Sequence, residues 1–148
     1  MENDSRKMKI KLDDGAYMPY RAHKEDAGYD IMTPIDFVLR ESTQNSCGMA
    51  VIDTGVHVEI PHGCVGILKS KSGLNVNHNI TGTGVIDEGY SGSIKVKLYN
   101  HGCQPYRFKK GDKIIQLVIY PIITPELEEV DELSESERGA QGFGSTGR

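Results

Sequence analysis

A carboxylate and a phenol stand three residues apart in the segment GTGVIDEGYSGSIKVKLYN (82–100), as Asp87 and Tyr90. Alternating apolar and polar residues on both sides of DEGYSG predict a β-hairpin with these two residues near its turn. A carboxylate in that place can lie beside a cavity without being part of the core, and a carboxylate is basic enough to polarise a water molecule. The alternative is structural, because Asp is a common turn former on which a Tyr can pack.

Groups that suit phosphate follow the apolar run CVGIL, in the segment KSKSGL (69–74). Two lysines alternate with two serines and a glycine follows, where we expect a strand to give way to a loop. Ammonium groups, small hydroxyls and backbone N–H groups in such a place can hold phosphate oxygens. A solvated basic turn is the alternative for this segment.

The C-terminal segment RGAQGFGSTGR (138–148) holds four glycines, two arginines and one phenylalanine. Glycine makes the backbone costly to order and a single Phe buries little apolar surface, so this segment cannot fold by itself. Its hydroxyls, closely spaced amides and guanidinium could hold an anion, and Phe143 could stack on a base. A disordered chain end is the alternative.

Two further segments combine polar residues with strand-like runs, AGYDI (27–31) and KKGDKIIQLVI (109–119). Gly111 and Asp112 predict a turn into a strand, and Gln116 interrupts the apolar run that follows. A Gln within a buried strand usually satisfies backbone groups, which is the structural alternative to ligand binding.

Strands must position all of these segments. Period-two alternation recurs in MKIKL (8–12), VHVEI (56–60), SIKVKLY (93–99) and KIIQLVIYPII (113–123). Turn-forming clusters such as PHG and NHG separate these runs at the spacing of a β-sandwich or barrel, so the sequence predicts an all-β domain. The acidic segment 125–137 has a weak helical periodicity, enough for a turn or two at most, and we interpret it as a charged spacer.

Length and composition bound the class of protein. The 148 residues suit one domain, and 37% hydrophobic with 26% charged residues is typical of a globular chain. No run approaches the roughly 18 apolar residues of a membrane span and the N-terminus lacks the apolar core of a secretory signal, so we expect a cytoplasmic protein. A formal net charge of −4 argues against binding to nucleic acid or membrane. Three widely spaced cysteines indicate neither a disulfide framework nor a zinc site.

Taken in order, AGYDI, SKSGL, GVIDEGYSG, GDKIIQL and RGAQGFGSTG resemble the five motifs of the homotrimeric dUTP diphosphatase (dUTPase) family. The resemblance runs from residue 27 to residue 147. It implies a jelly-roll-like β-barrel that assembles as a homotrimer, with active sites at subunit interfaces and a flexible C-terminal arm that closes a neighbouring site. Residues 1–124 would then be the barrel domain, 125–137 the acidic spacer and 138–148 the arm.

The same resemblance implies hydrolysis of dUTP to dUMP and pyrophosphate, which lowers dUTP and supplies dUMP for thymidylate synthesis. Asp87 matches the general base that deprotonates a water for in-line attack on the α-phosphorus. Tyr90 matches the residue that packs on the deoxyribose and excludes a 2′-hydroxyl. Uracil recognition by main-chain groups of the hairpin maps onto Thr81, Val85 and Ile86.

The other implied contacts surround the phosphates and the base. Phe143 of the arm would stack on uracil, and Asp30 matches an acid that supports the site. The substrate contacts implied outside the first strand and turn of the hairpin are Lys71, Ser72, Gly73, Lys95, Gln116, Arg138, Phe143, Gly144, Ser145 and Thr146. Mg²⁺ is the implied cofactor, bound through the three phosphates and water rather than directly by the protein.

One motif departs from the family pattern. Ser70-Lys71-Ser72-Gly73-Leu74 stands where the family usually has Pro-Arg-Ser-Gly-Leu. Lysine supplies charge without the bidentate fork of a guanidinium, so we expect the phosphate geometry to be looser, or compensated by Lys69 or Arg138.

Two other functions stay open at this point. A dCTP deaminase shares the fold and a similar hairpin, but its glutamate base falls on Lys97 here, which cannot accept the proton, and it lacks the GFGSTG arm. A non-catalytic trimeric barrel that binds a nucleotide or a protein is the second alternative. The joint presence of Asp87, Tyr90, Ser72 and a complete arm favours hydrolysis over both.

Overall fold

The computed structural model describes residues 7–147, and these residues fold mainly into strands. In chain order the elements are β1 (Lys9–Leu12), β2 (Gly28–Met32), β3 (Phe37–Leu39), β4 (Gly48–Asp53), β5 (Val56–Glu59), β6 (Cys64–Lys69), α1 (Ser72–His78), β7 (Ile80–Ile86), β8 (Lys95–Asn100), β9 (Tyr106–Phe108) and β10 (Lys113–Pro121). The prediction of an all-β domain is confirmed. Each of the four alternating runs contains one of the strands, β1, β5, β8 or β10.

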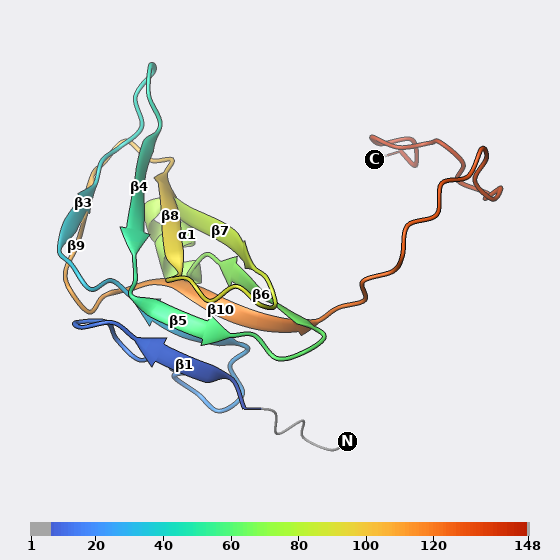
Figure 1. The fold of residues 1–148 in the computed structure, drawn as a ribbon. Coiled ribbons are helices and arrows are strands. Elements are labelled where there is room, and N and C mark those ends of the chain that lie inside the picture. The colour runs from blue at the N-terminus through green and yellow to red at the C-terminus, as the bar shows by residue number, and fades with distance from the viewer. Residues whose placement is uncertain (1–6, 148) are drawn as a thin grey trace.

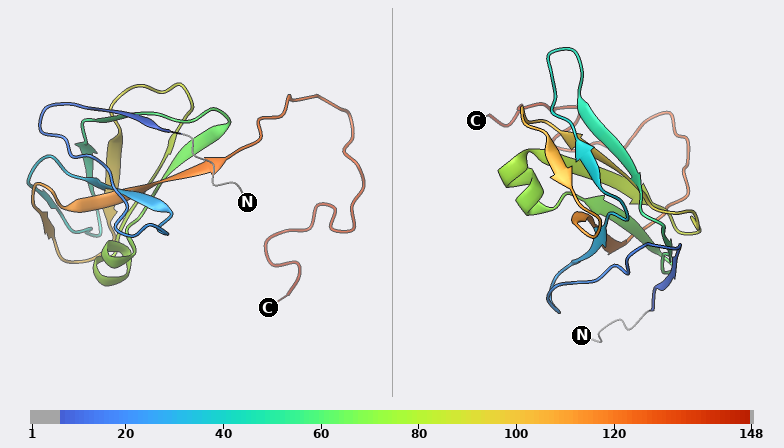
Figure 2. Two further views of the ribbon diagram at one scale, coloured as in Figure 1. Left: turned by 90° about the horizontal axis from the view of Figure 1, so that it is seen from below. Right: turned by 90° about the vertical axis from the view of Figure 1, so that its left-hand side faces the viewer.

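The described strands pair antiparallel in three sheets. The largest has six strands in the order β2-β10-β6-β7-β8-β4, and β1 pairs with β5 while β3 pairs with β9. The large sheet curls, and the two short sheets close its open side, with β1 and β5 below it and β3 and β9 at one side (Figure 1). The views in Figure 2 show that these sheets surround one interior.

That interior is a single apolar core. The strand β8 shows how alternation builds it, because Val96 and Leu98 are buried while Lys95 and Lys97 face outward. The largest fully buried apolar side chains come from strands on all sides of the barrel and, in Ile94, from the residue before β8: Ile31, Leu39, Val56, Leu68, Ile80, Ile94, Val96, Leu98, Ile114, Ile115 and Leu117.

The helix α1 corrects the expectation of a loop after the CVGIL run. It begins at Ser72 within the predicted phosphate segment and ends at His78, and the next residue, Asn79, adopts a left-handed conformation with φ of 55°. The helix buries none of its residues. It therefore carries no apolar stripe by which the sequence could have revealed it. By contrast, the weak helical periodicity of 125–137 produces no helix.

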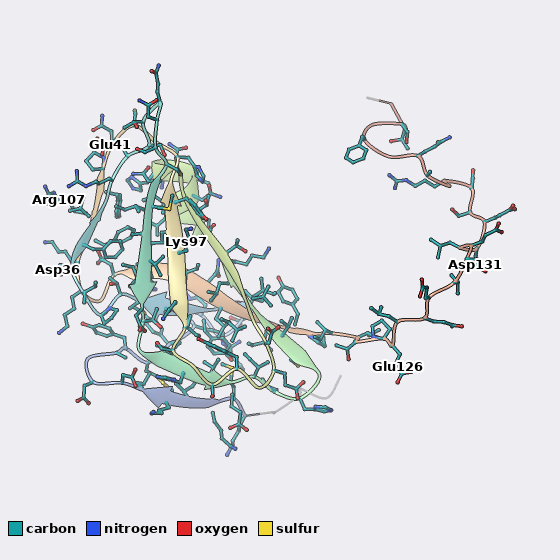
Figure 3. The ribbon with its side chains drawn as sticks, turned by 45° about the horizontal axis from the view of Figure 1, so that its top comes forward. Asp36, Glu41, Lys97, Arg107, Glu126 and Asp131 are labelled. Carbon is teal, nitrogen blue, oxygen red and sulfur yellow. The ribbon has the colours of Figure 1, made fainter. Side chains whose placement is uncertain are left out.

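Beyond β10 the chain leaves the barrel. Ile122 is the last residue tied to it by a backbone bond, through the carbonyl of Gly63 at 2.9 Å. The following segment extends into solvent and places Glu126 and Asp131 far from the strands (Figure 3). Within the described range, no helix is long and apolar enough to cross a membrane.

Candidate active site

The predicted hairpin forms, but it opens toward its tip. The strands β7 and β8 pair only at their closed end, as Ile80↔Asn100, Thr81↔Tyr99 and Gly82↔Leu98. From Thr83 to Ile86, β7 pairs instead with β6 on its other edge. In the described chain, the edge of β7 that faces β8 therefore has no ladder partner from Thr83 onward, and the hairpin is a fork.

Contacts on the far side of β8 fasten the segment that returns from the hairpin turn. The backbone groups of Ile94, just before β8, point away from β7. The N–H of Ile94 donates to the carbonyl of Val56 at 2.8 Å, and its carbonyl accepts from the N–H and the hydroxyl of Thr54 at 3.1 and 2.7 Å. The hydroxyl of Ser93 also donates to Asp53. The returning strand is thus fastened to the β4–β5 turn, away from β7.

The two chemically interesting residues of the hairpin lie at its turn, as predicted. Asp87 follows β7 directly and is exposed. The N–H of Tyr90 donates to the carbonyl of Asp87 at 3.1 Å, and the Tyr90 hydroxyl donates to the carbonyl of Ser93 at 3.0 Å. A Cβ on Gly92 would lie 2.4 Å from that hydroxyl oxygen. The ring of Tyr90 can therefore fold over the turn because residue 92 has no side chain.

The residues matched to uracil recognition divide between the two parts of the hairpin. Val85 stands on the open part and is 62% exposed, whereas Ile86 points into the core. Thr81 lies in the paired part, and its hydroxyl is within 2.7 Å of Nε2 of His101. Lys95, at the start of β8, is exposed beside the fork.

A second group of polar residues lies where β6, β7 and β10 meet. The hydroxyl of Ser70 accepts from the N–H of Gly82 at 3.0 Å and donates to its carbonyl at 3.1 Å. The side-chain amide of Gln116 donates to the carbonyl of Ser70 at 3.0 Å. A Cβ on Gly28 would lie 2.2 Å from Oε1 of Gln116, so the glycine of AGYDI leaves space for this amide. The first, second and fourth motifs are thereby brought together.

Two lysines share one buried carboxylate beside this group. Asp30 is 4% exposed, and it accepts from Lys71 on Oδ1 and from Lys113 on Oδ2, the latter at 2.8 Å. Burial raises the pKa of Asp30, but the hydrogen bonds from Lys113 and Lys71 outweigh it, so the pKa lies below its ordinary value. Asp30 is therefore a carboxylate that orients two cations.

These two regions of one chain lie at opposite ends of the β6–β7 ladder. Lys69 pairs with Thr83 at one end and Gly66 pairs with Ile86 at the other, so Ser72 and Asp87 emerge in opposite directions. Gly82, which Ser70 contacts, precedes Asp87 by five residues, or roughly 16 Å of strand. The hairpin turn and the lysine cluster of a single chain do not line one pocket.

The predicted arm is also distant from both regions. Figure 1 shows residues 122–147 running away from the barrel. The ring of Phe143 is fully exposed, and the guanidinium of Arg138 donates to the nearby carbonyl of Gln141 at 2.8 Å. Gly144, Ser145 and Thr146 continue the exposed segment.

Two residues with a part in this geometry were not among the predicted site residues: Ser70 and Lys113. The looser phosphate geometry, or its compensation by Lys69 or Arg138, stays a prediction. The second lysine on Asp30, beside Lys71, is Lys113. The sequence signal for Lys113 was its position in GDKIIQL, three residues before Gln116. The strand that contains both residues, β10, pairs with β2.

Comparisons with known proteins agree with the motifs. A family model described as dUTPase matches residues 14–147. The deoxyuridine 5′-triphosphate nucleotidohydrolase of Clostridium acetobutylicum is 42% identical over 140 residues, which cover 93% of each chain. A structure of the dUTPase of Staphylococcus bacteriophage 80alpha with dUpNHpp is 38% identical with a TM-score of 0.88, covering 97% of this chain and all of that one. A mutant dUTPase of S. aureus phage phi11, which coordinates a structural Mg(II) ion, is 34% identical with a TM-score of 0.78, over 88% of this chain and all of that one.

Proposed function

The chain belongs to the dUTPase family and is a dUTP diphosphatase, and from this premise we propose how its own residues bind and hydrolyse dUTP. The observation that carries the proposal is the forked hairpin. A fork that places an unpaired strand edge beside an exposed carboxylate supports binding of a base next to a hydrolytic centre.

Uracil enters the fork between β7 and β8. The backbone groups of Val85 and its neighbours that face β8 have no ladder partner, so they are available to a planar ring with its own donors and acceptors. Main-chain donors and acceptors that complement the edge of uracil reject cytosine. The exocyclic amine of cytosine reverses the order of donor and acceptor on that edge. A ring methyl is rejected on size. The bonds of Ile94 to Thr54 and Val56 fasten the returning segment on its other side.

Asp87 is the general base of the proposed reaction. Its exposed carboxylate accepts a proton from a water molecule, and the water oxygen attacks the α-phosphorus in line. The bond between the α-phosphorus and the oxygen bridging to the β-phosphorus breaks. dUMP and pyrophosphate leave, and Asp87 returns its proton to solvent.

Tyr90 selects the deoxyribose. Its ring lies folded over the hairpin turn, held by the bond from its hydroxyl to the carbonyl of Ser93. A sugar stacked on that ring has no room for a 2′-hydroxyl, which excludes ribonucleotides. Lys95, at the start of the returning strand, contacts the substrate on the other side of the fork.

The phosphates are held by the lysine cluster of a neighbouring subunit. Lys71 supplies charge and is oriented by Asp30, while Ser72, Gly73 and Gln116 provide hydroxyl, backbone and amide contacts. Since this cluster and Asp87 lie at opposite ends of one chain's ladder, we place them in one site through assembly of a homotrimer. A single chain then does not contain a complete active site.

The C-terminal arm of the third subunit closes the site. Phe143 stacks on uracil, and Arg138, Gly144, Ser145 and Thr146 hold the distal phosphates. Residues 1–124 act as the barrel, 125–137 as the spacer and 138–148 as the arm, which includes Arg148, outside the described residues. The extended, exposed course of 122–147 supports a segment that is ordered by another surface.

Mg²⁺ fits these residues as a cofactor held by the substrate. The buried carboxylate of the cluster, Asp30, has both oxygens bonded to lysines, so it is not available as a ligand. The cluster otherwise offers ammonium, hydroxyl and amide groups, which bind phosphate rather than a hard cation. When bound through phosphate oxygens and water, Mg²⁺ neutralises triphosphate charge. We propose the cytoplasm as the site of action, with dUTP as ligand and no nucleic acid or membrane as partner.

The proposal is tested by measuring pyrophosphate release from dUTP, dCTP, dTTP and UTP with Mg²⁺. Release from dUTP alone is expected. Asp87→Asn should lower kcat by about 10²–10⁴-fold while dUpNHpp still binds, because a general base contributes in that range. Near-normal turnover would remove Asp87 from its role. Ammonia release from dCTP without pyrophosphate would favour a deaminase, and binding without turnover a nucleotide-binding barrel.

A further inference from the structure

One histidine touches the catalytic turn from outside the proposed site. His57 belongs to β5, and its ring lies between two oxygen atoms that come from distant parts of the chain. Nδ1 is 2.8 Å from the carbonyl oxygen of Ser91, and Nε2 is 3.0 Å from Oδ2 of Asp13. The side chain is 19% exposed, so both contacts are partly shielded from water.

Both partners of the ring are acceptors. A backbone carbonyl has no proton to donate, and neither has an ionised carboxylate. A neutral imidazole carries one N–H and can satisfy one of the two oxygens, whereas an imidazolium carries two and satisfies both. Both contacts can be hydrogen bonds at the same time only if the ring is doubly protonated.

Asp13 gives the ring a fixed point. Its N–H donates to the carbonyl of Gly55 at 2.9 Å, and its own carbonyl accepts from Ala16 at 3.0 Å. The neighbouring pairing of Lys11 with His57 continues the β1–β5 ladder up to this place. The ring thus connects a backbone that is already held by the barrel to the less supported turn of the hairpin.

We propose that His57 is a positioning residue that holds the turn carrying Asp87 and Tyr90 in its working conformation only while both ring nitrogens are protonated. The inference rests on the proposed function, because it assumes that this turn contains the base and the sugar-selecting residue. Ser91 directly follows Tyr90, so a bond to the Ser91 carbonyl fixes the peptide between Ser91 and Gly92, one residue beyond the tyrosine.

Loss of one proton releases the turn rather than Asp13. The remaining N–H of a neutral ring goes to the carboxylate, since a hydrogen bond to an ionised acceptor is stronger than one to a carbonyl. The pKa of His57 is raised above 6.5, because the Ser91 carbonyl and the Asp13 carboxylate both accept from the charged ring; partial burial and Lys11 act in the opposite direction. The hydrogen bond from His57 to the Ser91 carbonyl, here called the tether, is therefore complete at low pH. It is lost as the pH rises through the raised pKa of His57.

The other charges around the ring do not replace this tether. Asp53, on β4, is bonded to Ser93 and to the N–H of Gly55, and Lys9 is paired with Glu59 at 3.2 Å. On the other side of the turn, Glu88 accepts from the N–H of Gly63 at 3.1 Å and lies 2.7 Å from Nδ1 of His62. The bond to Gly63 does not depend on the charge of His62, so it stays when His57 releases its side.

Nuclear magnetic resonance of the intact, active protein tests the protonation directly. The His57 ring should titrate above its ordinary value of about 6.5, and the Gly92 amide should shift with the same midpoint. Kinetics test the consequence: kcat for dUTP should fall across that midpoint. His57→Ala should lose about 10–100-fold in kcat below the midpoint, since misplacement by about 1 Å costs that much, and its kcat should show no further fall above it. His23→Gln, in an exposed loop, should keep the wild-type profile.

Asp13→Asn separates charge from mere packing. An Asn amide can donate to Nε2 of a neutral ring, which leaves the other ring N–H for Ser91, so the decline of kcat at high pH should disappear and the His57 midpoint should fall. An unchanged decline would overturn the proposal, as would a ring that titrates without moving Gly92. If the wild type releases no pyrophosphate from dUTP, the proposed function itself fails, whatever the ring does.

Discussion

Ser70 bonds both backbone groups of Gly82 through its single hydroxyl, accepting from the N–H at 3.0 Å and donating to the carbonyl at 3.1 Å. This side chain takes over where the β6–β7 ladder ends at Lys69↔Thr83. The strand that leads to Asp87 is thereby tied to the segment that leads to Lys71 and Ser72. A proline, as the family usually has at this position, cannot make these bonds.

Ser70→Ala is expected to destabilise the protein by about 1–3 kcal/mol, because Gly82 loses two partners in a partly buried place. The KM for dUTP should rise as well, since Lys71 and Ser72 lose their anchor. Denaturant unfolding and steady-state kinetics measure the two effects. Ser134→Ala, in the exposed spacer, is the matched control. Equal stability of the two variants would contradict a stabilising role of the Ser70 hydroxyl.

Asp30→Asn is expected to change how stability depends on pH. The folded-state pKa of Asp30 is lowered, so its contribution is present above its unfolded value of about 3.9 and is lost as the pH falls through the lower folded value. The variant should be less stable at neutral pH and should lose less stability on acidification below about pH 4. Chemical unfolding from pH 2 to pH 7 measures this. Asp131→Asn, in the exposed segment, should behave as the wild type, and a parallel pH dependence for Asp30→Asn would exclude the lysine pairing as its cause.

Gly92→Ala is expected to weaken selection against ribose. The added Cβ would lie 2.4 Å from the Tyr90 hydroxyl, so the ring must move from the turn while the barrel stays intact. The ratio of kcat/KM for dUTP to that for UTP should fall, with an unchanged melting temperature. Ser91→Ala keeps the carbonyl that His57 uses and should keep the ratio. A Gly92→Ala variant with wild-type selectivity would show that Tyr90 does not select the sugar.

Truncation after Glu137 should leave a folded protein with a large loss of turnover, because the described residues that it removes, 138–147, are mostly exposed and lie away from the barrel (Figure 1). Circular dichroism and pyrophosphate release measure these two properties. An unfolded product would mean that the tail is structural.

Mixed trimers test whether the site is shared. Asp87→Asn chains and chains truncated after Glu137 are each expected to be nearly inactive alone. When the two are refolded together in equal amounts, about a quarter of wild-type activity should return, because one site in each mixed trimer then has both an intact carboxylate and an intact arm. No recovery would place the arm and the carboxylate of each site in the same chain.

The sequence by itself determined the class of fold and the residue types of the site. Alternation with period two marks β1, β5, β8 and β10, because burial on one face of a sheet must follow the strand period. The same alternation predicted the hairpin around Asp87 and Tyr90. The helix at 72–78 was not predicted, since a short helix without a fully buried residue has no apolar stripe to display.

Only the tertiary structure decided how these residues are used. The fork lies between segments with different partners, because β7 pairs with β6 from Thr83 to Ile86 while Ile94 bonds to Thr54 and Val56, about 40 residues away along the chain. The lysines on Asp30 and the ring of His57 between Ser91 and Asp13 likewise join segments that share no local pattern. Local sequence specifies which groups can donate or accept, but the long-range register of the strands determines which of them meet.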